Sequence, residues 1–104
     1  MTRTDPYRLD GQVAVVTGAA GRLGPVWVGC LLEAGARVVA LDLERAPTSE
    51  ALQTLLDGAP EDSVLLHADV LDRTSLEQAR EAAEARFGVA SVLVNNAGID
   101  QPPS

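Results

Sequence analysis

The residues with the clearest chemical potential are Gly18, Gly21 and Gly24, which follow an apolar run over residues 13–16. A short run of valine and alanine is typical of a strand that is buried on both faces of a parallel sheet. Glycines after such a strand allow a sharp turn and let a bulky group approach the backbone. A following helix would aim its unpaired N–H groups and positive dipole end at that group, which is how proteins hold a diphosphate. The stretch therefore predicts a dinucleotide site.

An acidic side chain at the end of the next apolar run supports the same prediction. Asp42 follows residues 38–41 and lies 24 residues after Gly18. A carboxylate there can accept hydrogen bonds from both ribose hydroxyls of an adenosine, and its charge would repel a 2′-phosphate. Glycine turns also serve flavoproteins and methyltransferases, and a loop acid can simply be solvated, so these residues alone leave other nucleotide binders open.

Apolar periodicity indicates four strands that alternate with three helices. The strands are expected at residues 12–17, 37–43, 63–68 and 91–94, and the helices at residues 23–35, 47–58 and 72–87. This order predicts a parallel sheet whose first two helices cover one face and whose third helix covers the other. The sheet order is then 3-2-1-4. Its switch point brings residues 18–24 and 95–98 together, where such sheets bind ligands.

The first helix is expected to bury an apolar stripe at helical spacing. The members of this stripe are Leu23, Val26, Trp27, Cys30, Leu31 and Ala34. On this interpretation Cys30 is a small buried hydrophobe, and Trp27 lies in the core or at a helix–sheet contact.

The third helix has two candidate N-caps, because Asp72 can cap it and Thr74 with Glu77 matches a capping box. The residues expected on its inward side are Leu76, Ala79, Ala83 and Phe87. His67 in the third strand is interpreted as a packed or edge histidine rather than a chemical group of the site.

Composition narrows the classes of function. A length of 104 residues allows one domain at most. A formal net charge of −7 argues against nucleic acid or an anionic membrane as partners. All eight basic residues are Arg, so no lysine is available for catalysis. A single Cys30, no apolar run near the ~20 residues of a membrane span and a polar start of the chain predict a cytoplasmic protein. No Cys/His cluster suggests a metal.

Four segments together resemble the cofactor-binding half of a short-chain dehydrogenase/reductase. They are residues 16–24, Leu41-Asp42-Leu43, Ala68-Asp69-Val70 and Asn95-Asn96-Ala97-Gly98, and they occur in the order and at the separations usual in that family. The resemblance covers nearly the whole chain, and Asn-Asn-Ala-Gly is its most specific element. It implies an α/β fold with a Rossmann-like parallel sheet, truncated after the fourth strand. Residues 1–104 would be a partial NAD(P)-binding domain, with a lead-in arm at 1–11 and a tail at 99–104.

The resemblance also implies a role for each matching residue. The residues implied to bind the diphosphate are Gly18, Gly21, Arg22, Leu23 and Gly24. Asp42, with Leu43 beside it, would select NAD over NADP. Asp69 would accept a hydrogen bond from the adenine amino group, and the backbone of Val70 would lie beside the ring. Asn95 would tie the fourth strand to its neighbours, and the residues implied to line the ribose near the nicotinamide are Asn96, Ala97 and Gly98.

One departure from the family concerns the middle glycine of the turn. The commonest family pattern, Thr-Gly-x-x-x-Gly-x-Gly, would place it at position 22, where this chain has Arg22, and Gly21 stands one place earlier. The observed spacing is seen more in the family's extended branch, and the turn should still bind a diphosphate. Arg22 is open to two interpretations, a phosphate contact or a solvent-exposed side chain. A guanidinium near the ribose could also accommodate a 2′-phosphate, but Asp42 outweighs it.

The residues that carry catalysis in this family are absent from the chain. The family uses a tyrosine with a lysine four residues on and a serine that holds the substrate oxygen, normally after the fourth strand. The only tyrosine is Tyr7, ahead of the first strand, and there is no lysine. We therefore expect no catalytic residue and no turnover from this chain alone. An open edge on the fourth strand and an exposed apolar face are also expected, as in the front half of a larger fold.

Two functional interpretations follow, and a third is disfavoured. The first is the NAD-binding part of an oxidoreductase of this family, with a small-molecule substrate only where the missing C-terminal half is present and a homo-oligomer in the full-length form. The second is a stand-alone nucleotide-binding or interaction module that associates through the free edge of the fourth strand. A methyltransferase is disfavoured, because Asn-Asn-Ala-Gly has no role there.

Overall fold

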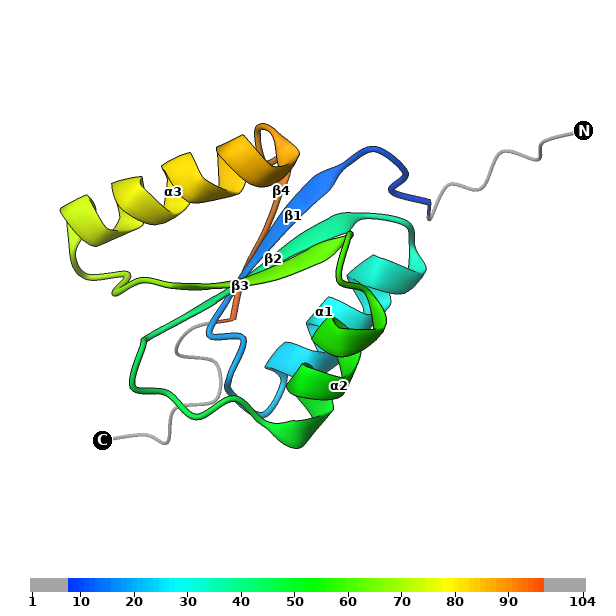
Figure 1. Ribbon diagram of the computed structural model, residues 1–104, viewed down its shortest axis with the longest axis horizontal. Coiled ribbons are helices and arrows are strands. Elements are labelled where there is room, and N and C mark those ends of the chain that lie inside the picture. Colours follow the sequence, from blue (N-terminus) through cyan, green and yellow to red (C-terminus); the bar gives the residue numbers. More distant parts are fainter. Residues whose placement is uncertain (1–7, 97–104) are drawn as a thin grey trace, which may run out of the picture.

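A computed structural model of the chain describes residues 8–96 and contains the expected alternation of strands and helices (Figure 1). The strands are β1 (Val13–Thr17), β2 (Arg37–Asp42), β3 (Ser63–His67) and β4 (Val92–Asn95). The helices are α1 (Gly24–Glu33), α2 (Glu50–Gly58) and α3 (Arg73–Phe87). All the expected elements are therefore confirmed, with small shifts at their ends.

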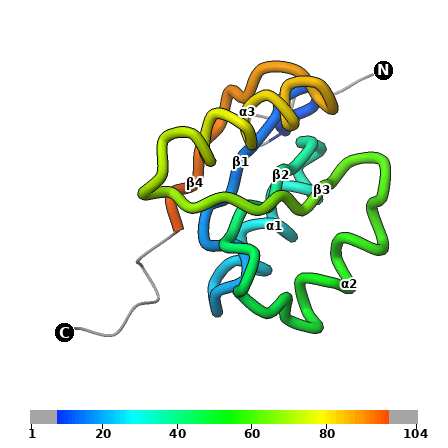
Figure 2. The backbone as a smooth tube through the Cα atoms, turned by 60° about the vertical axis from the view of Figure 1, so that its left-hand side comes forward, coloured from blue at the N-terminus to red at the C-terminus, as the bar shows by residue number. Residues whose placement is uncertain are grey.

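The strands form one parallel sheet in the order β3-β2-β1-β4, as predicted. In this register Val15 of β1 lies beside Val39 of β2 on one side and Leu93 of β4 on the other. Helices α1 and α2 cover one face of the sheet, and α3 alone lies over the other (Figure 1, Figure 2). The structure is thus a Rossmann-like α/β fold built on a four-stranded parallel sheet.

The face under α1 and α2 carries the larger core. Strand side chains from β1 and β2 meet Val28 and Leu31 of α1 and Leu52 of α2, and Val28 and Leu52 are completely buried. The face under α3 holds two smaller clusters, in which the alanines Ala79 and Ala83 pack against β1 and β2. Ala79 and Ala83 are buried and Leu76 and Phe87 are partly buried, so the predicted inward side of α3 is confirmed.

The predicted stripe on α1 was wrong in phase. The buried residues of α1 are Gly24, Val28 and Leu31, whereas Val26 is 58% exposed, Trp27 is 41% exposed and Cys30 is exposed. The reason is that α1 is apolar almost all round, so its sequence does not mark the face that must be buried. The start of the helix decides instead, because Gly24 packs directly against the backbone of Ala19, and Val28 and Leu31 follow Gly24 on the same buried side of the helix.

The caps of the other two helices are side-chain oxygens. Ser49 accepts from the N–H of Leu52 at the start of α2, at 3.1 Å. Asp72 caps α3 by accepting from the N–H groups of Thr74 and Ser75, at 3.0 and 3.3 Å, so the alternative capping box starting at Thr74 was wrong. Helix α3 already begins at Arg73, which leaves Thr74 inside the first turn.

Two further findings concern the part of the chain that the structure describes. His67 is exposed at the end of β3, an edge strand, in agreement with its interpretation as an edge histidine. Between residues 8 and 96, no helix has the length and apolar character needed to cross a bilayer.

Candidate functional site

The candidate site lies at the carboxyl end of the parallel strands, where β1 passes into the glycine turn, residues 18–24. Gly18 has a φ of +65°, a left-handed conformation that glycine adopts without strain. The N–H of Gly21 donates to the carbonyl of Gly18 at 3.0 Å, and the N–H of Gly24 donates to the carbonyl of Gly21 at 3.2 Å. The three-residue glycine spacing thus produces two successive four-residue turns, with a glycine at each junction.

Gly24 fixes where α1 begins. A Cβ at this position would lie 2.0 Å from the carbonyl oxygen of Ala19, which no side chain can tolerate. Leu23, the N-cap residue of α1, has no side-chain oxygen, and no acidic residue lies in the first turn. The positive end of the α1 dipole therefore faces the turn without a side-chain cap, unlike the starts of α2 and α3.

Two asparagines at the end of β4 connect that strand to β1 and the turn. The hydroxyl of Thr17 lies 3.1 Å from Oδ1 of Asn95, as expected of a residue that ties the strands together. The side-chain N–H of Asn96 donates to the carbonyl of Gly18 at 3.1 Å. Asn96 is 1% exposed, and its Oδ1 has no hydrogen-bond partner within residues 8–96. The structure thus brings Asn96 to the turn, while Ala97 and Gly98 lie outside the described residues.

Asp42 lies on the opposite side of the turn, at the end of β2. Its Oδ2 accepts from the N–H of Ala20 at 2.8 Å, and its Oδ1 accepts from the N–H of Leu43 at 2.7 Å. The predicted ribose acceptor is therefore also bonded to the middle of the glycine turn. Sequence reasoning did not find this contact, because it joins the end of β2 to the glycine turn, whose path no local pattern specifies.

The residues predicted at the adenosine end occupy two different places. They are Leu43, which was expected beside Asp42, and the expected adenine neighbours Asp69 and Val70. Leu43 and Asp69 line a cavity of about 340 Å³ at the ends of β2 and β3, which Arg45 and His67 also line. One carboxylate oxygen of Asp69 accepts from the N–H of Leu71 at 2.9 Å. Val70 instead lines a separate groove beneath α3.

Arg22 extends from the turn with an exposed side chain. Its guanidinium forms no ion pair with any residue from 8 to 96. The phosphate contact of Arg22 therefore stays a prediction. The same part of the chain contains no group of His, Cys, Asp or Glu side chains placed to hold a metal ion.

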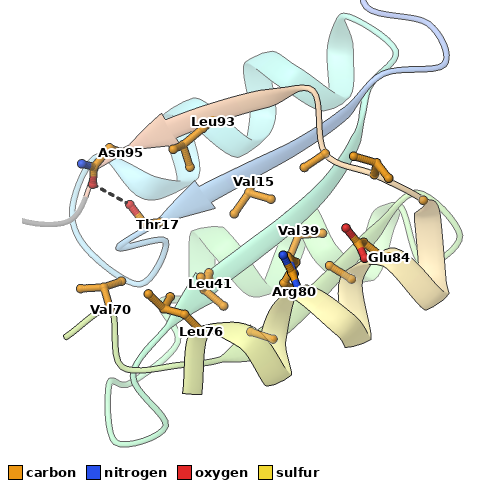
Figure 3. Close-up of a pocket in the computed structure, with 15 residues that line it drawn as sticks. Val15, Thr17, Val39, Leu41, Val70, Leu76, Arg80, Glu84, Leu93 and Asn95 are labelled. Carbon is orange, nitrogen blue, oxygen red and sulfur yellow. Dashed lines mark hydrogen bonds between the residues drawn. The ribbon is translucent and has the colours of Figure 1, made fainter. Parts of the chain in front are cut away.

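The separate groove is a cavity of about 570 Å³ between α3 and the sheet, which we call the apolar groove (Figure 3). Val15, Val39, Leu41 and Leu93 form its floor, and Arg80 and Glu84 of α3 border it. At one end the groove reaches Thr17 and Asn95. Leu93 is 67% exposed and Val89 is 76% exposed, so the exposed apolar face expected from the sequence is confirmed.

Comparison with known proteins gives consistent results. The sequence model of the short chain dehydrogenases matches residues 12–104. D-threitol dehydrogenase of Mycolicibacterium smegmatis is 41% identical over 93 residues, which are 89% of this chain and 35% of that protein. The chain thus spans about a third of the length of this curated relative.

Solved structures of similar fold match the chain as well. A short-chain dehydrogenase/reductase from Brucella melitensis has a TM-score of 0.70 and 28% identity, over 83% of this chain and 35% of that one. A structure from Haemophilus influenza that contains bound NAD has the same fold, with a TM-score of 0.70 at 22% identity, over 83% of this chain and 30% of that one.

Proposed function

Because the chain belongs to the short-chain dehydrogenase family, we propose that it is the NAD-binding part of an oxidoreductase of that family. The observation that carries the proposal is the position of Asp42, whose carboxylate lies at the end of β2 and contacts the glycine turn at 2.8 Å. A carboxylate at this point accepts hydrogen bonds from ribose hydroxyls and repels a 2′-phosphate, so NAD is proposed rather than NADP. Residues 1–104 form, on this proposal, one partial domain.

The residues present fit a dinucleotide. The turn approaches its own backbone so closely at Gly24 that only a glycine fits, and the α1 dipole faces the space in front of it. Gly18, Gly21, Arg22 and Leu23 would complete the diphosphate contacts. At the adenosine end Leu43, beside Asp42, and Asp69 line the smaller cavity. Asp69 would accept from the adenine amino group, and the backbone of Val70 would lie beside the ring.

Chemistry at the nicotinamide would depend on the remainder of the fold. NAD supplies hydride acceptance, and the proton of the substrate hydroxyl needs a separate acid–base group. Asn96, Ala97 and Gly98 would line the nearby ribose, and none of them is an acid or base. A small-molecule substrate, a homo-oligomeric assembly and a cytoplasmic location are proposed for a protein that includes the catalytic half.

Isothermal titration calorimetry tests the cofactor. We expect the chain to bind NAD more tightly than NADP, and Asp42→Ala to weaken NAD binding by at least about tenfold and to reduce the discrimination. The control is Asp57→Ala, which removes an exposed carboxylate on α2 whose bond is to Gln53. An unchanged NAD to NADP affinity ratio in Asp42→Ala would remove Asp42 from the site.

A second assay tests the proposal that this chain binds the cofactor but does not catalyse hydride transfer by itself. Purified chain mixed with NAD and a panel of alcohols should give no NADH absorbance, because it has no lysine to lower a tyrosine pKa. Steady NADH formation would contradict the proposal. A titration with S-adenosylmethionine would distinguish a methyltransferase, and we expect no binding heat from it.

The second candidate function is an interaction module that pairs through the edge of β4. The exposed side chain of Leu93 on β4 favours it, because an uncharged, apolar edge strand is prone to pairing. Sedimentation at increasing concentration discriminates the two candidates. A monomer throughout would count against edge pairing and leave the NAD-binding proposal intact.

A further inference from the structure

We infer that Asp42 is a positioning residue for the glycine turn as well as a ribose acceptor, and that its carboxylate holds the turn in its diphosphate-binding shape before a nucleotide arrives. The inference deepens the proposed function and rests on it for the identity of the ligand. It assigns Asp42 a second task in the same site, performed through the backbone of Ala20.

The hydrogen-bond pattern of the turn shows why an external acceptor is needed. The bond from Gly21 to Gly18 closes a four-residue turn in which Ala19 and Ala20 are the central residues. The N–H groups of the two central residues have no acceptor inside such a turn. In this chain the end of β2 supplies both acceptors. The carbonyl of Leu41 accepts from Ala19 at 3.1 Å, and the Asp42 carboxylate accepts from Ala20 at 2.8 Å.

The first turn is therefore held from two strands. Asn96 fixes its first carbonyl, that of Gly18, from the β4 side. Asp42 fixes its apex from the β2 side, and a hydrogen bond to a carboxylate is about twice as strong as one between neutral groups. Gly24 then packs against Ala19, so any shift of the apex would be passed to the start of α1. The shape of the diphosphate site thus depends on a side chain that need not touch a phosphate.

The two tasks of Asp42 are compatible. Each carboxylate oxygen can accept more than one hydrogen bond, and here each already accepts one from the backbone. The remaining lone pairs can receive the ribose hydroxyls while the bond to Ala20 is kept. Two backbone donors also fix the orientation of the carboxylate, so less ordering is needed when a ribose binds.

Amide hydrogen exchange on the full chain without nucleotide tests the positioning task directly. We expect the amide of Ala20 to be protected in the wild-type protein and to exchange about tenfold faster in Asp42→Ala. The amide of Leu52 is the matched control, because it also donates to a side-chain oxygen, that of Ser49, far from the turn. An unprotected Ala20 amide in the wild-type protein, or equal acceleration of both amides in the variant, would overturn the inference.

Calorimetry with AMP and ADP then connects the turn to diphosphate binding. If Asp42 served the ribose alone, Asp42→Ala would weaken AMP and ADP by the same factor. If it also positions the turn, the loss should be about tenfold larger for ADP, which carries the second phosphate. Equal losses would overturn the inference. Absence of binding by either nucleotide, with Ala20 still protected, would instead contradict the proposed function and leave the positioning task standing.

Discussion

The two faces of the sheet differ in how completely they are covered, although both are formed by the same strands. On the face under α1 and α2, large aliphatic side chains from two helices meet the strands, and Val28 and Leu52 are fully buried. On the face under α3, a single helix contributes Ala79 and Ala83, and the apolar groove remains beside it. We call the face under α1 and α2 the closed face and the face under α3 the open face. The glycine turn leads into α1 and so lies next to the closed face.

The elements of the proposed nucleotide site and the exposed apolar surface lie in different parts of the molecule. The parts that shape the glycine turn lie at the ends of β1, β2 and β4 and at the start of α1, and all are present. The open face leaves Leu93 and Val89 largely exposed, a feature of surfaces that contact other chain segments or other molecules. The two faces should therefore respond differently to the same kind of substitution.

The largest expected effect is a loss of stability from the closed face. Leu52→Ala should lower the free energy of unfolding by about 2–5 kcal/mol, because Leu52 is 0% exposed and its removal leaves a cavity. Leu93→Ala, the same change on the open face, should stay within about 0.5 kcal/mol. Urea unfolding followed by circular dichroism measures both. Similar losses in the two variants would mean that the faces are equally packed in solution.

The next effect concerns the junction of the turn with α1. Gly24→Ala should destabilise the chain by about 1–3 kcal/mol, since its Cβ would lie 2.0 Å from the carbonyl oxygen of Ala19. Gly58→Ala is the matched control at the end of α2, where an added Cβ meets no atom within 4 Å. The control should be neutral or stabilise by up to about 1 kcal/mol. Thermal unfolding of the two variants would refute the tight junction if their midpoints moved together.

The buried side of a helix could be predicted from the sequence only where charged residues marked its solvent-exposed side. The charged residues of α3 leave one apolar side, so Ala79 and Ala83 were correctly placed inward. Helix α1 has no charged residue before Glu33. Its buried side follows from the contact of Gly24 with Ala19 in the glycine turn, which no pattern within the helix reveals. Strand order followed from the right-handedness of the crossover connections, a general rule of chain geometry, with the third connection returning past the first strand.

The site shows the same division. The positions of Gly18 and Asp42 at the ends of neighbouring strands followed from the strand pattern. The bond from Ala20 to Asp42 depends on the path of the turn, which the spacing of the glycines alone did not specify. Even so, the three-residue spacing carried a usable signal, because it matches two successive turns closed by hydrogen bonds three residues apart.

A smaller effect is expected from the open face, on association rather than on stability. Leu93→Lys should shift the sedimentation coefficient toward that of the monomer, because a charge on an edge strand opposes pairing. The matched control is Leu71→Lys, which adds the same charge at a residue that is 92% exposed and does not line the apolar groove. Equal behaviour of the two variants would show that net charge, and not the β4 edge, controls association.

The smallest effect concerns the segment before β1, which is joined to the end of α1. Arg8 contacts Asp10 at 2.7 Å and donates to the carbonyl of Glu33 at 2.8 Å. The hydrogen bond from Arg8 lowers the pKa of Asp10, its partial desolvation opposes the shift, and the charge of Arg8 adds to the lowering. Because the folded-state pKa is the lower one, the stabilisation is present above the ordinary aspartate pKa and is lost as the pH falls through the lowered value. In Arg8→Gln, NMR titration of the Asp10 carboxyl should therefore give a higher pKa than in the wild-type chain, and an equal pKa in both would mean that the exposed pair does not persist in solution.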